Sequence, residues 1–193
     1  MQKFFLLILL LIISCTSSFM GTSTSKAERI TDSIIDPNNF DSQRLEFFIH
    51  ERVNQIRDSY NVAPLELETK LQQAAASQAE NMKNWNRVSH HQISLSKFSL
   101  TNRVQYFNIK NKHVGENVAD VYLDVPMKVN FASDILVVKT YKETADALVL
   151  SWKYSPGHFK NMTDPDFKYT GIKVQINPSK KTVYAAQVFG SEI

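Results

Sequence analysis

Residues 151–162 read SWKYSPGHFKNM, and this stretch predicts that one helix ends and a second, short helix begins. Ahead of the break, apolar residues repeat at the spacing of one helical face: Ala145, Leu148, Val149 and Trp152. Ser155 suits the N-cap position of a new helix, and Pro156 suits its first turn, where the missing N–H costs nothing. His158 then falls in the first turn of the second helix, from which its imidazole would face a cleft.

Two other short segments resemble this one in offering a polar side chain where an element begins or ends. Ser89-His90 follows a predicted helix over 69–84, and Gly115-Glu116-Asn117 opens an extended segment. Together with the SPGH turn and a C-terminal Gln187–Gly190, these motifs resemble the CAP superfamily. This group comprises the cysteine-rich secretory, antigen-five-like and pathogenesis-related proteins. The resemblance covers roughly residues 45–190 and is strongest to the bacterial branch.

The resemblance implies a three-layer α-β-α sandwich and a site built from two histidines and two glutamates. On the matching motifs, the histidines are His90 and His158, and the first glutamate is Glu116. Glu143 is the nearest candidate for the second glutamate. However, Thr140-x-x-Glu143 also reads as a capping box, which explains this carboxylate without any site.

The residue patterns independently predict an α+β fold, in which a small antiparallel sheet packs between helices. A first helix has Asp41 or Ser42 as its cap and stops before Pro64. The second helix has an inner stripe of mostly small residues: Leu71, Ala74, Ala75, Gln78, Ala79 and Met82. Residues 92–112 read as polar and irregular, and residues 121–138 as an elaboration with two β-prone runs. The alternation of Ile172, Val174 and Ile176 predicts one strand of a C-terminal hairpin, and residues 182–189 the other.

The candidate site residues support more than one kind of chemistry. Two imidazoles with one or two carboxylates can bind a divalent cation such as zinc, or can perform acid–base work. His90 is preferred over His91 only because the motif aligns it, since a histidine after a helix is commonly a capping or surface residue. Glu116 could also accept buried backbone hydrogen bonds and fix its loop, either in place of a role in the cleft or together with it. Arg103 is expected to be structural.

The N-terminus predicts export. Lys3 and the apolar run 4–13 form a targeting segment too short to span a bilayer, and it ends at Cys15. A cysteine at that place resembles a bacterial lipoprotein cleavage site, so we expect a signal peptide over 1–15 and lipidation of Cys15, with ordinary secretion as the alternative. Residues 16–40 form a tether and lead-in, and the domain spans 41–193. Cys15 is the only cysteine, which excludes an intramolecular disulfide framework.

Two classes of function remain open. A net charge of +3 without a basic block gives no electrostatic case for nucleic acid. The first class is an extracytoplasmic, non-enzymatic binding module that takes a small-molecule, lipid or peptide ligand, with or without a metal. The second is a metal-dependent or acid–base hydrolase acting on peptide or cell-envelope material. The sequence carries no nucleophile-elbow motif and no HExxH, which favours the first class.

Overall fold

The computed structural model describes residues 31–110, 113–128 and 135–192. Its helices and strands follow one another in the order α1 Ser42–Ser59, β1 Glu66–Leu67, α2 Thr69–Trp85, the 3-10 helix η1 Leu95–Lys97, α3 Leu100–Tyr106, β2 Val114–Tyr122, β3 Pro126–Lys128, β4 Ile135–Val137, α4 Tyr141–Lys153, α5 Pro156–Thr163, β5 Tyr169–Asn177 and β6 Thr182–Gly190. The predicted Cys15 anchor and the targeting segment lie outside the described residues.

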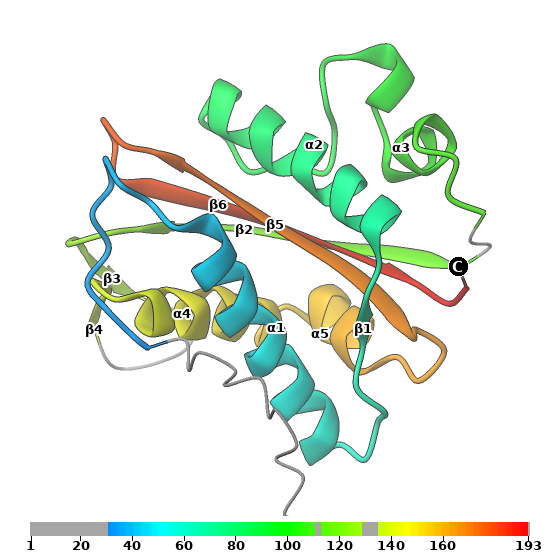
Figure 1. The fold of residues 1–193 in the computed structure, drawn as a ribbon, viewed down its shortest axis with the longest axis horizontal. Helices are drawn as coiled ribbons and strands as arrows, with labels where there is room; N and C mark the ends of the chain where they lie inside the picture. The colour runs from blue at the N-terminus through cyan, green and yellow to red at the C-terminus, as the bar shows by residue number, and fades with distance from the viewer. Residues whose placement is uncertain (1–30, 111–112, 129–134, 193) are drawn as a thin grey trace, which may run out of the picture.

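The layers are those of an α-β-α sandwich, so the predicted α+β fold is confirmed. One sheet with strand order β1-β5-β6-β2 separates α2 and α3 on one face from α1, α4 and α5 on the other (Figure 1). β5 and β6 form the predicted hairpin, and β2 pairs antiparallel with β6 from Val114↔Gly190 to Tyr122↔Thr182. The short β1 pairs parallel with β5, which makes the sheet mixed and not purely antiparallel.

β6 lies at the centre of the molecule, and all nine of its residues are buried. Because successive side chains of a strand point to opposite faces, β6 supplies both cores. Val183 and Ala185 pack with α1 and α4, whereas Tyr184 and Ala186 pack with α2. This double burial explains why residues 182–189 show no polar alternation.

α2 packs very closely on β5 because of one glycine. A Cβ on Gly171 would lie 2.1 Å from the backbone nitrogen of Gln72, so only glycine permits this approach. The predicted inner stripe of α2 is the buried face of the helix, including Gln78.

Three parts of the chain differ from the sequence-based expectations. Residues 92–112 are not irregular throughout, because they contain η1 and α3. A capping box formed by Ser99 and Asn102 begins α3, and the sequence did not predict it. Residues 121–138 contribute the end of β2 and the separate hairpin β3–β4. The lead-in is partly folded, since Ile35 packs in the core and Ile34 bridges to Thr140.

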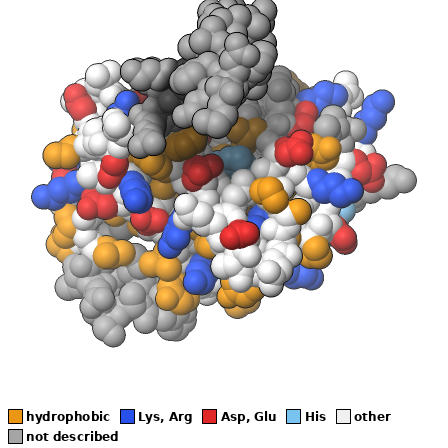
Figure 2. Space-filling model, turned by 60° about the horizontal axis from the view of Figure 1, so that its bottom comes forward, with side chains coloured by type: hydrophobic (Ala, Val, Ile, Leu, Met, Phe, Trp, Pro, Cys, Tyr) orange, Lys and Arg blue, Asp and Glu red, His pale blue; other side chains and the backbone are white. Residues whose placement is uncertain are grey.

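The surface of the described residues carries charges of both signs. Seen from below, acidic and basic side chains are intermixed, in keeping with the small net charge (Figure 2). Within the ranges that the structure covers, no helix has the length and apolar character needed to cross a membrane.

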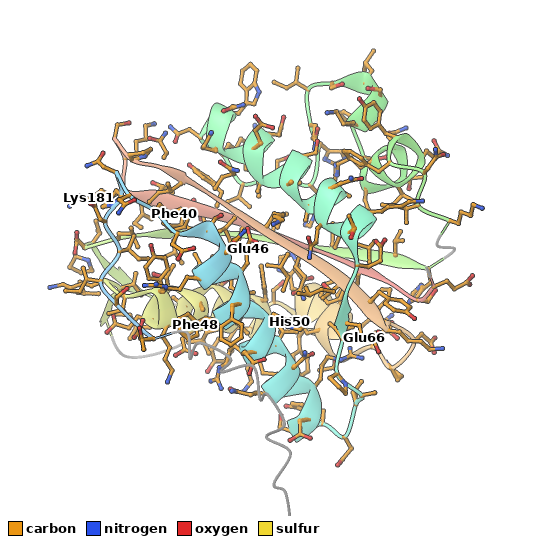
Figure 3. The ribbon with its side chains drawn as sticks, viewed as in Figure 1. Phe40, Glu46, Phe48, His50, Glu66 and Lys181 are labelled. Atoms are coloured by element: carbon orange, nitrogen blue, oxygen red, sulfur yellow. The ribbon has the colours of Figure 1, made fainter. Side chains whose placement is uncertain are left out.

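α1 closes the outer edge of β5 beyond the short β1. Glu46 and His50 lie one turn apart on α1 (Figure 3). Glu46 accepts a hydrogen bond from the backbone N–H of Val174 at 3.4 Å and pairs with Lys173 at 2.8 Å. Burial raises the pKa of Glu46, and the lysine partly offsets this effect.

Candidate functional site

The structure brings His90, Glu116 and His158 together, although they come from three different elements. His90 lies in the loop after α2, Glu116 lies in β2, and His158 lies in the first turn of α5. His90 Nδ1 is 2.9 Å from Glu116 Oε1, and His90 Nε2 is 3.5 Å from His158 Nε2. The ring centroids of the two histidines are 5.6 Å apart.

Glu116 is buried, and both of its carboxylate oxygens have partners. Oε1 pairs with His90, and Oε2 pairs with the guanidinium of Arg103, which is itself fully buried. A buried carboxylate requires such partners, because removing a charge from water is costly. Both partners are side chains, and within the described ranges no backbone N–H donates to this carboxylate.

Arg103 performs the structural task that was expected of it, and it does so at the site. Its Nη1 donates to the backbone carbonyls of His90 at 3.3 Å and Lys97 at 3.2 Å. One guanidinium therefore joins Glu116 to the loop that carries His90. No local residue pattern indicated that Arg103 pairs with Glu116.

The histidine pair is partly open to solvent, and the surroundings of His158 favour its neutral form. The side chain of His90 is 48% exposed. Burial lowers the pKa of His158, repulsion from His90 lowers it further, and the charge of Glu116 acts in the opposite direction. When His90 donates its Nδ1 proton to Glu116, its Nε2 carries the lone pair that faces His158.

Two asparagines fix α5 against β2. Asn117 donates to the backbone carbonyl of His158 at 3.1 Å, and Asn161 donates to the backbone carbonyl of Glu116 at 3.2 Å and to Asn117 Oδ1 at 3.0 Å. Gly115 makes room for this contact, since a Cβ there would lie 2.9 Å from Asn161 Oδ1. Both asparagines are part of the motifs, but their positions in the sequence did not predict these hydrogen bonds.

The His90 loop is also held from α2. Gln78, on the inner face of that helix, donates to the backbone carbonyl of Ser89, and its Oε1 accepts a hydrogen bond from Gln92 at 3.0 Å. These buried amides explain why a glutamine stands among the small apolar residues of α2.

Glu143 caps α4 and does not join His90, Glu116 and His158. Its Oε2 accepts hydrogen bonds from the backbone N–H groups of Lys139 at 2.9 Å and Thr140 at 3.0 Å, at the start of α4. These bonds lower the pKa of Glu143. Among the described residues, the four-residue arrangement is thus reduced to two histidines and one glutamate, with Arg103 as a fourth, cationic member.

A family model matches most of the folded chain. The model of the cysteine-rich secretory protein family, CAP, matches residues 50–189, a range that includes His90, Glu116 and His158. The chain belongs to the CAP family. The resemblance found in the four sequence motifs is therefore confirmed.

Bacterial proteins are among the relatives of this CAP protein. The chain is 25% identical over 122 residues to the uncharacterized protein YkwD of Bacillus subtilis and 28% identical over 126 residues to the membrane protein YlbC of the same organism. The matches cover 63% and 65% of this chain but only 39% and 30% of those proteins. The chain therefore corresponds to a part of each relative.

Solved structures confirm the fold. An extracellular protein with an SCP domain from Bacillus anthracis superposes with a TM-score of 0.58 at 22% identity, over 78% of this chain and 41% of the other. An outer surface protein of Borrelia burgdorferi superposes with a TM-score of 0.60 at 14% identity, over 84% of this chain and all (100%) of the other.

Proposed function

We propose that this CAP protein is an exported, non-enzymatic binding module whose His90–His158 pair holds a divalent cation, with zinc as the best fit. The observation that carries the proposal is the approach of the two Nε2 atoms to 3.5 Å. Neutral imidazole is a standard zinc ligand, and the lowered pKa of His158 favours the neutral form.

The spacing of the two nitrogens suits one shared ion. Two ligand atoms of a tetrahedral zinc lie about 3.3 Å apart when each Zn–N bond is about 2.0–2.1 Å long. The observed Nε2–Nε2 distance is only slightly longer. The pair would therefore need little rearrangement to bind zinc.

Glu116 would act on the metal through His90 and not as a direct ligand. Both of its oxygens are engaged, one by His90 Nδ1 and one by Arg103. A carboxylate that accepts the second N–H of a ligating histidine fixes the tautomer and orients the ring. Two histidines leave coordination positions open, and a small-molecule, lipid or peptide ligand with an oxygen donor would fill them.

The names of the structural relatives support export. The Bacillus anthracis protein is described as extracellular and the Borrelia burgdorferi protein as an outer surface protein. The targeting segment of this chain agrees with that location, and Cys15 is its proposed lipid anchor.

Calorimetry with zinc tests the proposal. The wild type should bind about one zinc per chain at pH 7.5, and His90→Ala and His158→Ala should each lose most of the heat while their circular dichroism stays unchanged. Binding should weaken at pH 5.5, because protonated imidazoles do not coordinate metal.

His91→Ala is the matched control. His91 neighbours His90, but its ring packs against Phe98, whereas His158 packs against His90. This variant should bind zinc like the wild type. Wild-type protein without zinc heat, or an equal loss in His91→Ala, would rule the proposed metal site out.

A further inference from the structure

A second surface, beside the loop that carries His90, carries exposed apolar side chains. It lies at the C-terminal end of α2 and on the loop through η1, on the side of the sheet opposite α1 and α4 (Figure 1). We call it the α2–η1 patch, and its exposed apolar members are Trp85 (61%), Ile93 (59%), Leu95 (86%) and Phe98 (44%). Single exposed apolar residues are ordinary, but contiguous ones mark an interaction surface, and Trp85, Ile93 and Phe98 line the same groove.

The same part of the chain is free of acidic residues. No Asp or Glu occurs from Asn81 to Gly115, and this segment holds six cations: Lys83, Arg87, Lys97, Arg103, Lys110 and Lys112. Arg103 is buried and forms an ion pair with Glu116, so it does not contribute to the charge of this surface. Arg87 is exposed beside the apolar members, and Lys97 lies over the ring of Tyr106 at 4.9 Å. On the face shown in Figure 2, in contrast, acids and bases are intermixed.

A groove crosses the patch. It has a volume of about 560 Å³, and its walls include Trp85, Arg87, His91 and Phe98. The ring of His91 packs against Phe98 in a tilted arrangement, with a centroid distance of 4.6 Å. The groove therefore combines apolar walls with a guanidinium, which suits a ligand that has both an anionic group and an apolar part.

From this combination we infer that the α2–η1 patch docks on the surface of an anionic phospholipid membrane. Leu95, Ile93 and Phe98 enter the boundary between headgroups and acyl chains, and Trp85 lies at the headgroup level, where indole is favoured. Arg87 and Lys97 contact lipid phosphates, and nearby basic residues add attraction to an anionic leaflet.

The shape of the patch favours a membrane over an acidic protein partner. The most exposed side chain, Leu95, begins a single 3-10 turn, so it projects as a short loop and not as part of a flat surface. A fluid bilayer accepts such a projection without a complementary pocket. This inference does not depend on zinc binding by His90 and His158.

Tryptophan fluorescence of the full-length chain with lipid vesicles tests the inference. The chain has two tryptophans, and Trp152 is fully buried, so changes on vesicle addition report Trp85. Phosphatidylglycerol vesicles with brominated acyl chains should quench and blue-shift Trp85. Phosphatidylcholine vesicles should do so much less, and 0.5 M salt should reduce the effect. Quenching of Trp85, and not total binding, is the readout, since the apolar run 4–13 would itself associate with lipid.

Variants separate the patch from the rest of the chain. Leu95→Ser with Ile93→Ser should raise the lipid concentration for half-maximal quenching about tenfold or more, because two exposed apolar anchors are lost. Arg87→Glu with Lys97→Glu should abolish the preference for anionic lipid. Leu67→Ser (53% exposed, on β1) and Lys180→Glu are the matched controls and should behave like the wild type.

Three results of the vesicle experiments would overturn membrane docking or its preference for anionic lipid. Trp85 that is unquenched by anionic vesicles, or quenched equally in the serine variant, would overturn membrane docking. Equal quenching by both lipids would overturn the anionic preference. A patch that instead binds a soluble acidic polypeptide, with no response to vesicles, would assign it to a protein partner. His90→Ala should not change any of these readings.

Discussion

At the scale of single residues, Glu116 and Arg103 show that the site depends on a buried pair behind the two histidines. Arg103 neutralises Glu116 and holds the His90 loop by its carbonyl groups, and Glu116 in turn orients His90. Such a supporting residue orients the side chains that would bind a metal, without contacting the metal itself.

Glu116→Gln is expected to weaken zinc binding about 10–100-fold, because an amide orients the imidazole less well than a carboxylate does. The variant should also be less stable than the wild type, since the buried guanidinium of Arg103 loses its counter-charge. Calorimetry and urea unfolding measure the two effects. Unchanged zinc affinity in a folded variant would show that Glu116 does not act through His90.

The lowered pKa of His158 predicts a pH dependence of stability in protein without added metal. The unfolded state takes up a proton near the ordinary pKa of 6.5, whereas the folded state resists it because of burial and the neighbouring His90. The unfolded state therefore binds more protons, and the free energy of unfolding falls as the pH drops below about 6.5.

His158→Gln removes this contribution. The wild type should lose more stability than His158→Gln between pH 7.5 and pH 5, as measured by urea unfolding. Parallel losses in the two proteins would mean that the pKa of His158 is not lowered in the folded state.

At the scale of elements, α4 and α5 begin with similar signals but are capped differently. Thr140 Oγ1 accepts a hydrogen bond from the N–H of Glu143 at 3.2 Å, and Glu143 completes the box. Ser155 occupies the N-cap position of α5 before Pro156, but its side chain makes no capping hydrogen bond. Ser155 therefore holds the expected N-cap position without the side-chain hydrogen bond that usually accompanies it.

Thr140→Ala and Ser155→Ala therefore form a matched pair. Thr140→Ala should cost about 1 kcal/mol of stability, the usual value for a lost N-cap bond, and Ser155→Ala less than about 0.5 kcal/mol. Thermal or urea unfolding of both variants measures the difference. A larger cost for Ser155→Ala would show that its hydroxyl caps α5 in solution.

At the scale of the whole molecule, the sandwich depends on how closely α2 lies on the sheet. Gly171 is in contact with the backbone of Leu71 and Gln72, and a backbone cannot move aside as a flexible side chain can. The layer that carries the His90 loop is thus positioned by a residue of β5.

Gly171→Ala should destabilise the protein by about 2 kcal/mol or more, because the added methyl forces α2 away from β5. It should also weaken zinc binding, since the His90 loop is attached to α2 through Gln78. Gly157→Ala is the control, because a Cβ at Gly157 meets no other atom within 4 Å. A wild-type melting temperature for Gly171→Ala would contradict the close contact.

The sequence by itself determined much of the secondary structure. Apolar periodicity located α1, α2 and α4, and turn chemistry located the β5–β6 hairpin, because each of these signals is local and repeated. The four motifs also identified the family and with it His90, Glu116 and His158. The sequence did not reveal α3, since seven residues with few buried positions give too little periodicity.

Only the tertiary structure decided which atoms of the site meet. In the folded chain, the two carboxylate oxygens of Glu116 pair with His90 and Arg103, and Glu143 caps α4. The Nε2 atoms of His90 and His158 face each other. The tertiary structure also gathered the apolar and basic side chains between residues 85 and 98 on one exposed surface. The physical reason is that contacts between residues 68 positions apart depend on how the layers pack, and local sequence patterns carry no record of that packing.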